Sequence, residues 1–203
     1  MKVFDFDNTI YRGESPVDFC FYMIRENKKI IRYVPTIIFS LIGYKLHLMK
    51  KEKLESLTNE FLENVMDDPD SLSDSVRRFW ETHYHKLDLN ILRLIEPDDV
   101  IITASPTFIM NGVSGKLRTN NILGTEIDLQ KKRLTWYNFG ENKVERYRSI
   151  YGYRHIDAVY TDSFYDEYLM GISREVYIVR HGNVHRLRHK ERRLSHAGSN
   201  WSI

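Results

Sequence analysis

The feature that most constrains this chain is the run VFDFDNTI at residues 3–10. It has the apolar pattern of a short buried strand over residues 2–7, yet it carries carboxylates at Asp5 and Asp7. Charged groups are almost never fully buried unless something pairs with them. The run therefore predicts a strand whose end supplies two carboxylates to a site, and their partners must come from elsewhere in the chain.

The pattern beyond this strand divides the chain into parts. Residues 11–99 show no strand pattern, whereas apolar residues recur there at helical spacing and Ser15-Pro16 predicts the start of a helix. After residue 99, short β-branched runs alternate with helical ones, which is typical of a parallel α/β sheet. We expect three parts: a Rossmann-like three-layer α/β core at 1–12 and 96–190, an all-helical domain inserted after the first strand at 13–95, and a basic, flexible tail at 191–203.

The core elements are expected from the same patterns. Strands are expected at 100–102, 123–129, 133–136, 156–160 and 176–179, and helices at 16–27, 106–117, 141–151 and 165–170. A domain inserted after the first strand lies beside that strand's carboxyl end, and ligands of open α/β sheets bind at that end.

Polar side chains follow several of the expected strands. Asp5 and Asp7 end the first, Thr103 ends the second, and Asp162 ends a later one. A parallel sheet brings these ends to one edge, where three converging carboxylates would repel one another unless a cation joined them. Mg²⁺ is the natural candidate because it prefers a few carboxylate oxygens and completes its shell with waters and substrate phosphate.

The other polar groups suit phosphoryl transfer. A hydroxyl at Thr103 and an ammonium at Lys143 could hold the remaining oxygens of a phosphate. An aspartate can itself act as a nucleophile and form an acyl phosphate. With Asp5 attacking, Asp7 lies two residues on, on the same side of an extended chain, where it could exchange a proton with the leaving group and then with water.

These motifs resemble the haloacid dehalogenase superfamily of phosphatases, in particular its phosphoserine-phosphatase-like branch with a helical cap. The first motif is matched by DFDNT at residues 5–9, the second by VIIT ending at Thr103, with Ser105 as the rival if the register is shifted. The third is matched by Lys143 in GENKVERYRSIYG, and the fourth by DSFYD at residues 162–166. The resemblance covers essentially the whole sheet domain.

The resemblance implies a role for each matched position. It makes Asp5 the nucleophile and a metal ligand, and Asp7 the general acid and base whose backbone carbonyl also binds the metal. It makes Thr103 and Lys143 ligands of the phosphoryl group. It further implies that Asp162 is a metal ligand, that Asp166 supports the metal site from behind the direct ligands or orients metal-bound water, and that Glu14 contacts substrate.

Two motifs depart from the phosphoserine phosphatase pattern. The fourth has Thr161 and Ser163 where that branch has glycines on either side of the aspartate, and the second continues as Ala104-Ser105-Pro106 where that branch continues with glycines. Both changes keep the catalytic groups and alter their surroundings. They put phosphoserine in doubt as the substrate more than they put phosphatase chemistry in doubt.

The composition of the chain limits its expected partners and cellular compartment. The 203-residue chain has a formal net charge of +2, which gives no reason to expect a nucleic-acid partner. A single cysteine, Cys20, excludes an internal disulfide and favours a reducing compartment, so we expect a cytoplasmic protein. The most apolar run, the 12 residues YVPTIIFSLIGY at 33–44, is too short to span a bilayer and is expected to be a buried cap helix.

We therefore expect a Mg²⁺-dependent phosphomonoesterase that acts on a small phosphorylated metabolite through an aspartyl-phosphate. Two alternatives stay open: a phosphatase for a lipid or membrane-associated phosphate, and a phosphotransferase or phosphomutase using the same site. The lipid alternative comes from the apolar run together with the basic stretch 180–193, which allow peripheral membrane contact. The oligomeric state stays open.

Overall fold

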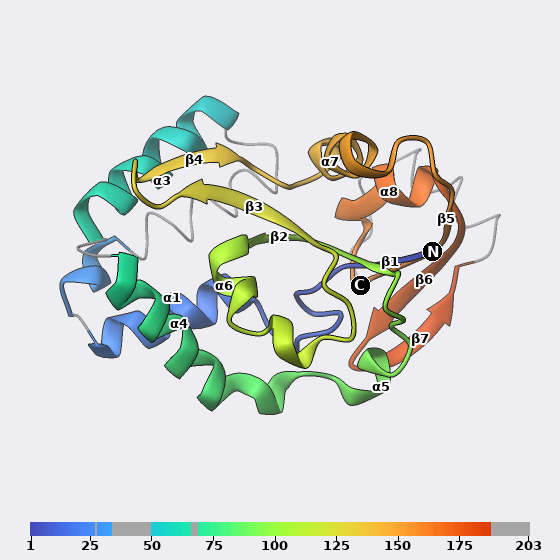
Figure 1. The fold of residues 1–203 in the computed structure, drawn as a ribbon, viewed down its shortest axis with the longest axis horizontal. Helices are drawn as coiled ribbons and strands as arrows, with labels where there is room; N and C mark the ends of the chain where they lie inside the picture. Colours follow the sequence, from blue (N-terminus) through green and yellow to red (C-terminus); the bar gives the residue numbers. More distant parts are fainter. Residues whose placement is uncertain (27, 34–49, 66–68, 188–203) are drawn as a thin grey trace, which may run out of the picture.

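A seven-stranded sheet forms the centre of the protein, with strand order β4-β3-β2-β1-β5-β6-β7 (Figure 1). The computed structural model describes residues 1–26, 28–33, 50–65 and 69–187. The five inner strands are parallel, and β4 and β7 pair antiparallel at the two edges. The strands are β1 Lys2–Phe4, β2 Val100–Pro106, β3 Ile122–Asp128, β4 Arg133–Trp136, β5 Ile156–Thr161, β6 Ser173–Arg180 and β7 Asn183–Arg186.

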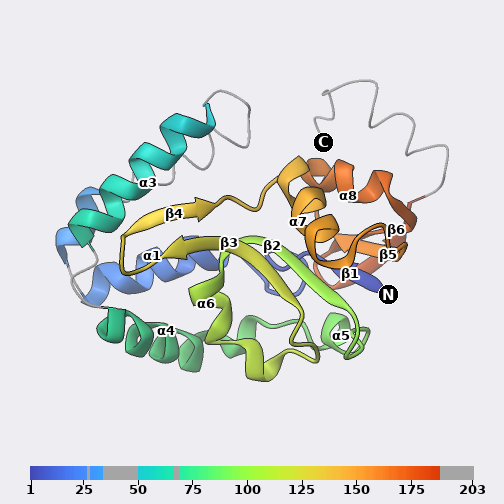
Figure 2. The ribbon, with the colours of Figure 1, turned by 45° about the horizontal axis from the view of Figure 1, so that its top comes forward.

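Helices cover both faces of the sheet, which gives the three expected layers (Figure 2). One face carries α7 (Glu141–Tyr151) and α8 (Glu167–Gly171), and the other carries α5 (Leu89–Leu92) and α6 (Thr107–Asn111). Each strand contributes side chains to both helical layers because successive side chains point to opposite faces of the sheet. Val3 packs with the α7 and α8 side, and Phe4 packs with the α5 and α6 side. The expected α/β class is confirmed.

The secondary-structure elements described between β1 and β2 are all helices, joined by turns and loops. They are α1 Ser15–Glu26, η1 Lys28–Arg32, α3 Lys51–Val65, α4 Pro69–His83, η2 Tyr84–Lys86 and α5. Helix α4 is anchored to the α6 layer because the indole of Trp80 donates a hydrogen bond to Ile109 O at 2.7 Å. Helix α3 lies beside β4, and Leu134 N donates to Asn59 Oδ1 at 2.8 Å. The helical part thus contacts both helix α6 and the edge strand β4.

Three expectations about elements need correction. The helix expected over 106–117 is replaced by α6 and a short 3-10 turn at Ser114–Lys116, since Gly112 ends α6 in close contact with Trp80. The strand expected at 100–102 continues to Pro106. The strand expected at 176–179 is longer and is followed by β7, whose exposed residues gave no apolar alternation to detect.

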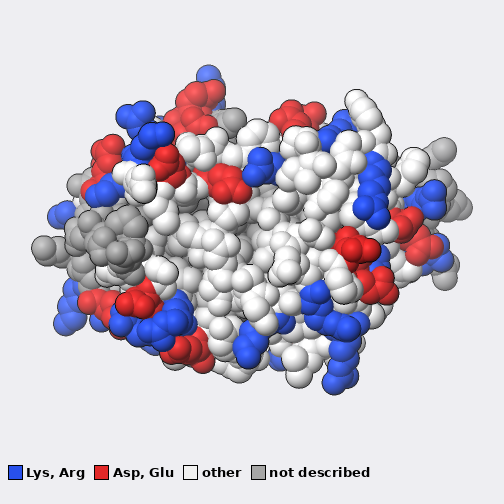
Figure 3. Space-filling model, in the orientation of Figure 1, with Lys and Arg blue, Asp and Glu red and all other residues white. Residues whose placement is uncertain are grey.

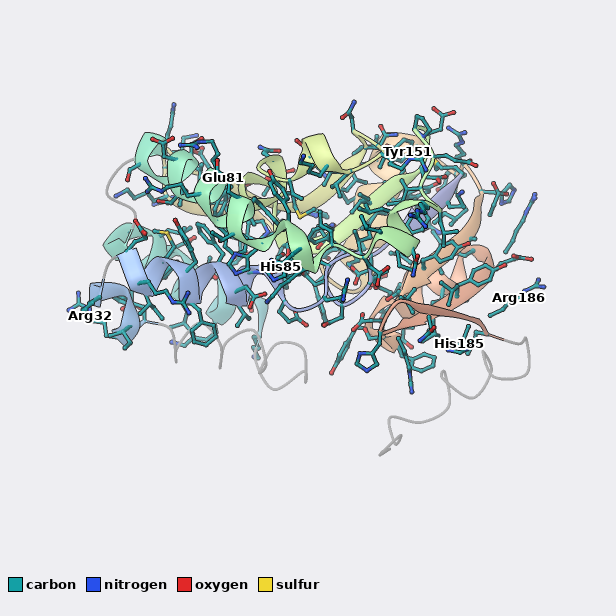
Figure 4. All side chains as sticks on the ribbon, turned by 90° about the horizontal axis from the view of Figure 1, so that it is seen from below. Arg32, Glu81, His85, Tyr151, His185 and Arg186 are labelled. Atoms are coloured by element: carbon teal, nitrogen blue, oxygen red, sulfur yellow. The ribbon has the colours of Figure 1, made fainter. Side chains whose placement is uncertain are left out.

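Two predicted segments lie wholly or partly outside the described residues. The apolar run 33–44 is described only at Tyr33, and the basic tail 191–203 is not described. The first part of the basic stretch is described and forms β7, with His185 and Arg186 at the edge of the sheet (Figure 4).

The surface carries charges of both signs. On the face drawn in Figure 3, Lys, Arg, Asp and Glu gather around the margin, and the middle is largely uncharged. Among the described residues, no helix has the length and apolar character that crossing a membrane requires.

Candidate functional site

The site lies where the three neighbouring strands β2, β1 and β5 end. Asp5 directly follows β1, Thr103 lies in the middle of β2, just after its regular pairing with β3 is interrupted, and Asp162 directly follows β5. Asp5 N donates to Tyr160 O at 2.8 Å, so its backbone still continues the β1–β5 pairing. Parallel pairing thus brings together groups more than 150 residues apart.

A buried lysine joins two of the carboxylates. Lys143 Nζ lies 2.8 Å from Asp5 Oδ1 and 2.7 Å from Asp166 Oδ1. Asp166 Oδ2 also accepts a hydrogen bond from Thr161 Oγ1 at 2.8 Å. Lys143 and Asp166 are each 3% exposed and Asp5 is 9% exposed, so these charges face one another away from bulk water.

The group holds more negative than positive charge. Burial is the largest effect on Asp5, and with the nearby Asp166 and Asp162 carboxylates it raises the Asp5 pKa well above its usual range despite the contact with Lys143. Burial acts to lower the Lys143 pKa, but Asp166 and Asp5 together raise it, so Lys143 stays protonated. Two carboxylates share the Lys143 ammonium and the Asp162 carboxylate lies near enough to act on Asp5, so a further cation would be stabilised there.

Asp7 has a different set of partners. Its Oδ1 accepts the backbone N–H of Ser15 at 2.6 Å, and its Oδ2 accepts the Ser105 hydroxyl at 2.5 Å and, more weakly, the Thr103 hydroxyl at 3.5 Å. Burial and the Glu14 carboxylate raise the pKa of Asp7 to about 6, against the hydrogen bonds from Ser105 and Ser15, which lower it. A carboxyl with this pKa can both give and take a proton near neutral pH.

A tight turn after Asp7 builds this environment. Asn8 takes a left-handed φ of 58°, and the backbone N–H groups of Thr9, Ile10 and Tyr11 all donate to Phe6 O. The chain then reverses into α1, whose first residue contacts Asp7. Glu14 Oε1 accepts a hydrogen bond from Asn8 Nδ2 at 2.9 Å, so the turn holds Glu14 near Asp7.

The structure thus places every expected site residue near this edge, in two groups. Asp5, Lys143 and Asp166 form one group, with Asp162 acting on Asp5 electrostatically. The second group consists of Asp7, Thr103 and Glu14. Thr103 and Lys143 contact different carboxylates rather than each other.

Two residues contribute more than the sequence indicated. Ser15 was expected only to begin a helix, and Ser105 only to replace Thr103 if the register shifted. The two hydroxyls lie 3.0 Å apart, both are fully buried, and both residues bond Asp7. The sequence feature that could have indicated this is the spacing of Ser105, two residues beyond Thr103, since both hydroxyls donate to Asp7 Oδ2.

The carboxylates suit a hard cation. Within the described ranges, no group of three His, Cys, Asp or Glu side chains stands ready to hold a metal ion. Mg²⁺ does not need such a cage, because one or two carboxylates with waters and substrate phosphate suffice. The excess negative charge around Asp5, carried by Asp162 and Asp166, fits that requirement.

Residues 3–170 match the family model of the haloacid dehalogenase-like hydrolases. The chain belongs to this family. The expected resemblance is confirmed over most of the chain, and the carboxylates after β1 and β5 lie inside the matched range.

Solved structures share the fold of this haloacid dehalogenase-like hydrolase at low sequence identity. A protein of unknown function from Bordetella pertussis Tohama I is 15% identical, with 84% of this chain and 85% of that chain covered and a TM-score of 0.68. A phosphoserine phosphohydrolase-like protein from Francisella tularensis subsp. tularensis SCHU S4 is 13% identical, with 87% and 86% covered and a TM-score of 0.55. No curated protein sequence matches the chain significantly.

Proposed function

We propose that this hydrolase is a Mg²⁺-dependent phosphomonoesterase that acts through a phosphoryl group carried on Asp5. The observation that supports this most is the division of partners between the two aspartates. Asp5 is held by the Lys143 ammonium, whereas Asp7 is held by hydroxyl and backbone donors and has a pKa of about 6. One carboxylate is thus arranged for attack, and the other for proton transfer.

The reaction has two steps on these residues. In the first, an Asp5 carboxylate oxygen attacks phosphorus, the bond to the leaving oxygen breaks, and Asp7 gives that oxygen its proton. In the second, water attacks phosphorus, Asp7 takes its proton, and the bond to Asp5 breaks, which restores the Asp5 carboxylate and the protonated form of Asp7. Lys143 and the Thr103 hydroxyl hold the phosphoryl oxygens, and Lys143 offsets their charge.

The metal would be held by Asp5 and Asp162 side chains and by the backbone carbonyl of Asp7. Asp166 would act behind them, because it is already engaged by Lys143 and Thr161. Bound Mg²⁺ would neutralise charge on the phosphoryl oxygens. The protein's own contribution is to hold the carboxylates close enough for that.

The helical residues 13–95 are proposed to act as the cap, and residues 1–12 with 96–190 as the catalytic core. Glu14 lies in the turn that enters the helical part, beside Asp7, and is proposed to contact the substrate. A small phosphorylated metabolite is the proposed substrate class. The lipid alternative depends on the apolar run 33–44 and the basic stretch 180–193, which are described only at Tyr33 and at 180–187.

A substrate panel tests this proposal. Purified protein would be assayed for phosphate release from sugar, amino acid, nucleotide and lipid phosphates, with and without Mg²⁺. Release from one of the small soluble esters supports the proposal, and release from the lipid phosphates alone would favour the alternative. Parallel assays with an added alcohol or sugar acceptor separate hydrolysis from transfer, because transfer yields a phosphorylated acceptor instead of free phosphate.

A further inference from the structure

The end of β2 departs from regular pairing with β3 at the site. Ile102 pairs with Leu123 and Pro106 with Thr125, so residues 103–105 lie opposite the single residue Gly124. A bulge of this kind bends a strand and re-aims its side chains. It also takes backbone groups out of the ladder, and buried backbone groups need partners from elsewhere.

Two buried side chains supply those partners. Asn138 Nδ2 donates to Thr103 O and to Leu123 O, each at 2.9 Å, and so ties the bulge to β3. Thr125 Oγ1 donates to Ala104 O at 2.7 Å and accepts the Asn138 backbone N–H at 3.1 Å. Asn138 is fully buried and Thr125 is 4% exposed. Together Asn138 and Thr125 bond the carbonyls of two consecutive bulge residues, Thr103 and Ala104.

Neighbouring groups restrict the movement of Asn138 and of the bulge. Asn138 Oδ1 accepts the Trp136 indole N–H at 3.3 Å, so the backbone N–H and both side-chain polar atoms of Asn138 are engaged. On the other side, a Cβ on Gly124 would lie 2.6 Å from Ser105 O. The bulge is therefore held closely against β3.

We propose that Asn138, assisted by Thr125, is a positioning residue that sets the phosphoryl-binding hydroxyl of Thr103. This rests on the proposed phosphatase function. The Thr103 carbonyl accepts a hydrogen bond from Asn138, and the Thr103 hydroxyl faces Asp7. The direction of the hydroxyl therefore depends on the hydrogen bond that holds the Thr103 backbone. Asn138 also lies in the segment that leads into α7, which carries Lys143. Asn138 thus links β2, which carries Thr103, to the segment that precedes Lys143.

A purely structural role is the alternative, and the chain offers a matched control for it. Asn121 lies at the opposite end of the same two strands, and its Nδ2 donates to Pro97 O at 3.3 Å and Asp99 O at 3.2 Å. Asn121→Asp therefore makes the same chemical change against two carbonyls, away from the site. Asn138→Asp replaces the donor with a carboxylate that repels Thr103 O and Leu123 O.

The test measures kcat/KM for p-nitrophenyl phosphate, inhibition by inorganic phosphate and the thermal unfolding midpoint. Asn138→Asp is expected to lower kcat/KM and weaken phosphate inhibition by about tenfold or more, because small misplacements of binding groups are costly to catalysis. The isosteric Thr125→Val is expected to lower kcat/KM by about threefold. Asn121→Asp is expected to stay within about twofold of wild type in both measurements, whatever its midpoint.

Coupling to Thr103 provides a readout that general destabilisation would not change. If Asn138 acts through Thr103, adding Asn138→Asp to Thr103→Ala should cost far less than it does in wild type. Equal losses in the two backgrounds would overturn the proposal, as would equal losses from Asn138→Asp and Asn121→Asp. Should Asn138→Asp fail to fold, a wild-type kcat/KM in Thr125→Val would overturn it. Wild-type protein without Mg²⁺-dependent phosphate release would instead contradict the function on which the proposal rests.

Discussion

Asp5 sits where a carboxylate is costly to the fold and useful to the chemistry. It is buried beside Asp166 and Asp162, and Lys143 is the cation in contact with it. Its raised pKa means that the ionised form needed for attack is disfavoured until a further cation arrives. Sites of this kind exchange stability for function.

Stability measurements on metal-free protein test this view of Asp5. We expect Asp5→Asn to raise the free energy of unfolding by about 1 kcal/mol, because it leaves Lys143 and Asp166 as a balanced pair. We expect Lys143→Met to lower it by roughly 3 kcal/mol, because two buried carboxylates then face no cation. Urea unfolding in the presence of EDTA measures both.

An exposed lysine provides the control for that experiment. Lys131, on the surface with its ion pair to Asp128 at 3.3 Å, should tolerate methionine within about 0.5 kcal/mol. Equal losses of stability in Asp5→Asn and Lys143→Met would show instead that Asp5 and Lys143 are a simple stabilising ion pair.

At the scale of elements, the close approach of β2 and β3 depends on a glycine. A Cβ at Gly124 would meet the Ser105 carbonyl at 2.6 Å, and the backbone cannot rotate away as a flexible side chain would. We expect Gly124→Ala to destabilise the protein by about 2 kcal/mol and to lower kcat/KM about tenfold, because β3 must move off the bulge. Thermal unfolding and p-nitrophenyl phosphate assays measure the two effects.

Gly115 is the matched control, since a Cβ there meets no atom within 4 Å. Gly115→Ala should change neither stability nor activity by more than a small amount, about 0.5 kcal/mol or less. A Gly124→Ala protein that behaves like Gly115→Ala would contradict the close packing of the bulge.

The elements show what sequence patterns can and cannot predict. The parallel α/β core and the strands that end at Asp5 and Asp162 were predictable, because buried strands leave apolar runs bounded by polar residues. The bulge at 103–105 was not, because it depends on how β3 lies beside β2. Strand β7 was missed because its residues are all exposed.

The same distinction applies to the site. Asp5, Asp7 and Lys143 stand in motifs with a recognisable order. Asn138 carries no such motif, and its importance arises from hydrogen bonds to residues 15 and 35 positions away. Hydrogen bonds between residues so far apart in the sequence form only in the assembled sheet, so the local sequence cannot reveal them.

At the scale of the whole molecule, the helical and sheet parts share a core. One apolar cluster contains Phe19 from α1, Leu62 from α3 and Trp80 from α4 together with Phe4 and Ile101 from the strands. We therefore expect a change at the site to alter the stability of the whole molecule.

Metal binding should show this. A ligand that binds only the folded state stabilises it by about 2.7 kcal/mol at a concentration of 100 times Kd. We expect saturating Mg²⁺ to raise the wild-type Tm by a few degrees. Asp162→Asn should abolish the rise, whereas Asp128→Asn on the surface should keep it. An undiminished rise in Asp162→Asn would exclude Asp162 as a ligand.

The most direct test of the central claim is phosphate release from p-nitrophenyl phosphate by purified wild-type and Asp5→Asn protein, with Mg²⁺ and with EDTA. Asp157→Asn, at an exposed position of β5, serves as the control variant. We predict Mg²⁺-dependent release by wild type and by Asp157→Asn, and none by Asp5→Asn. Hydrolysis by Asp5→Asn at the wild-type rate would contradict the assignment of Asp5 as the residue that carries the phosphoryl group.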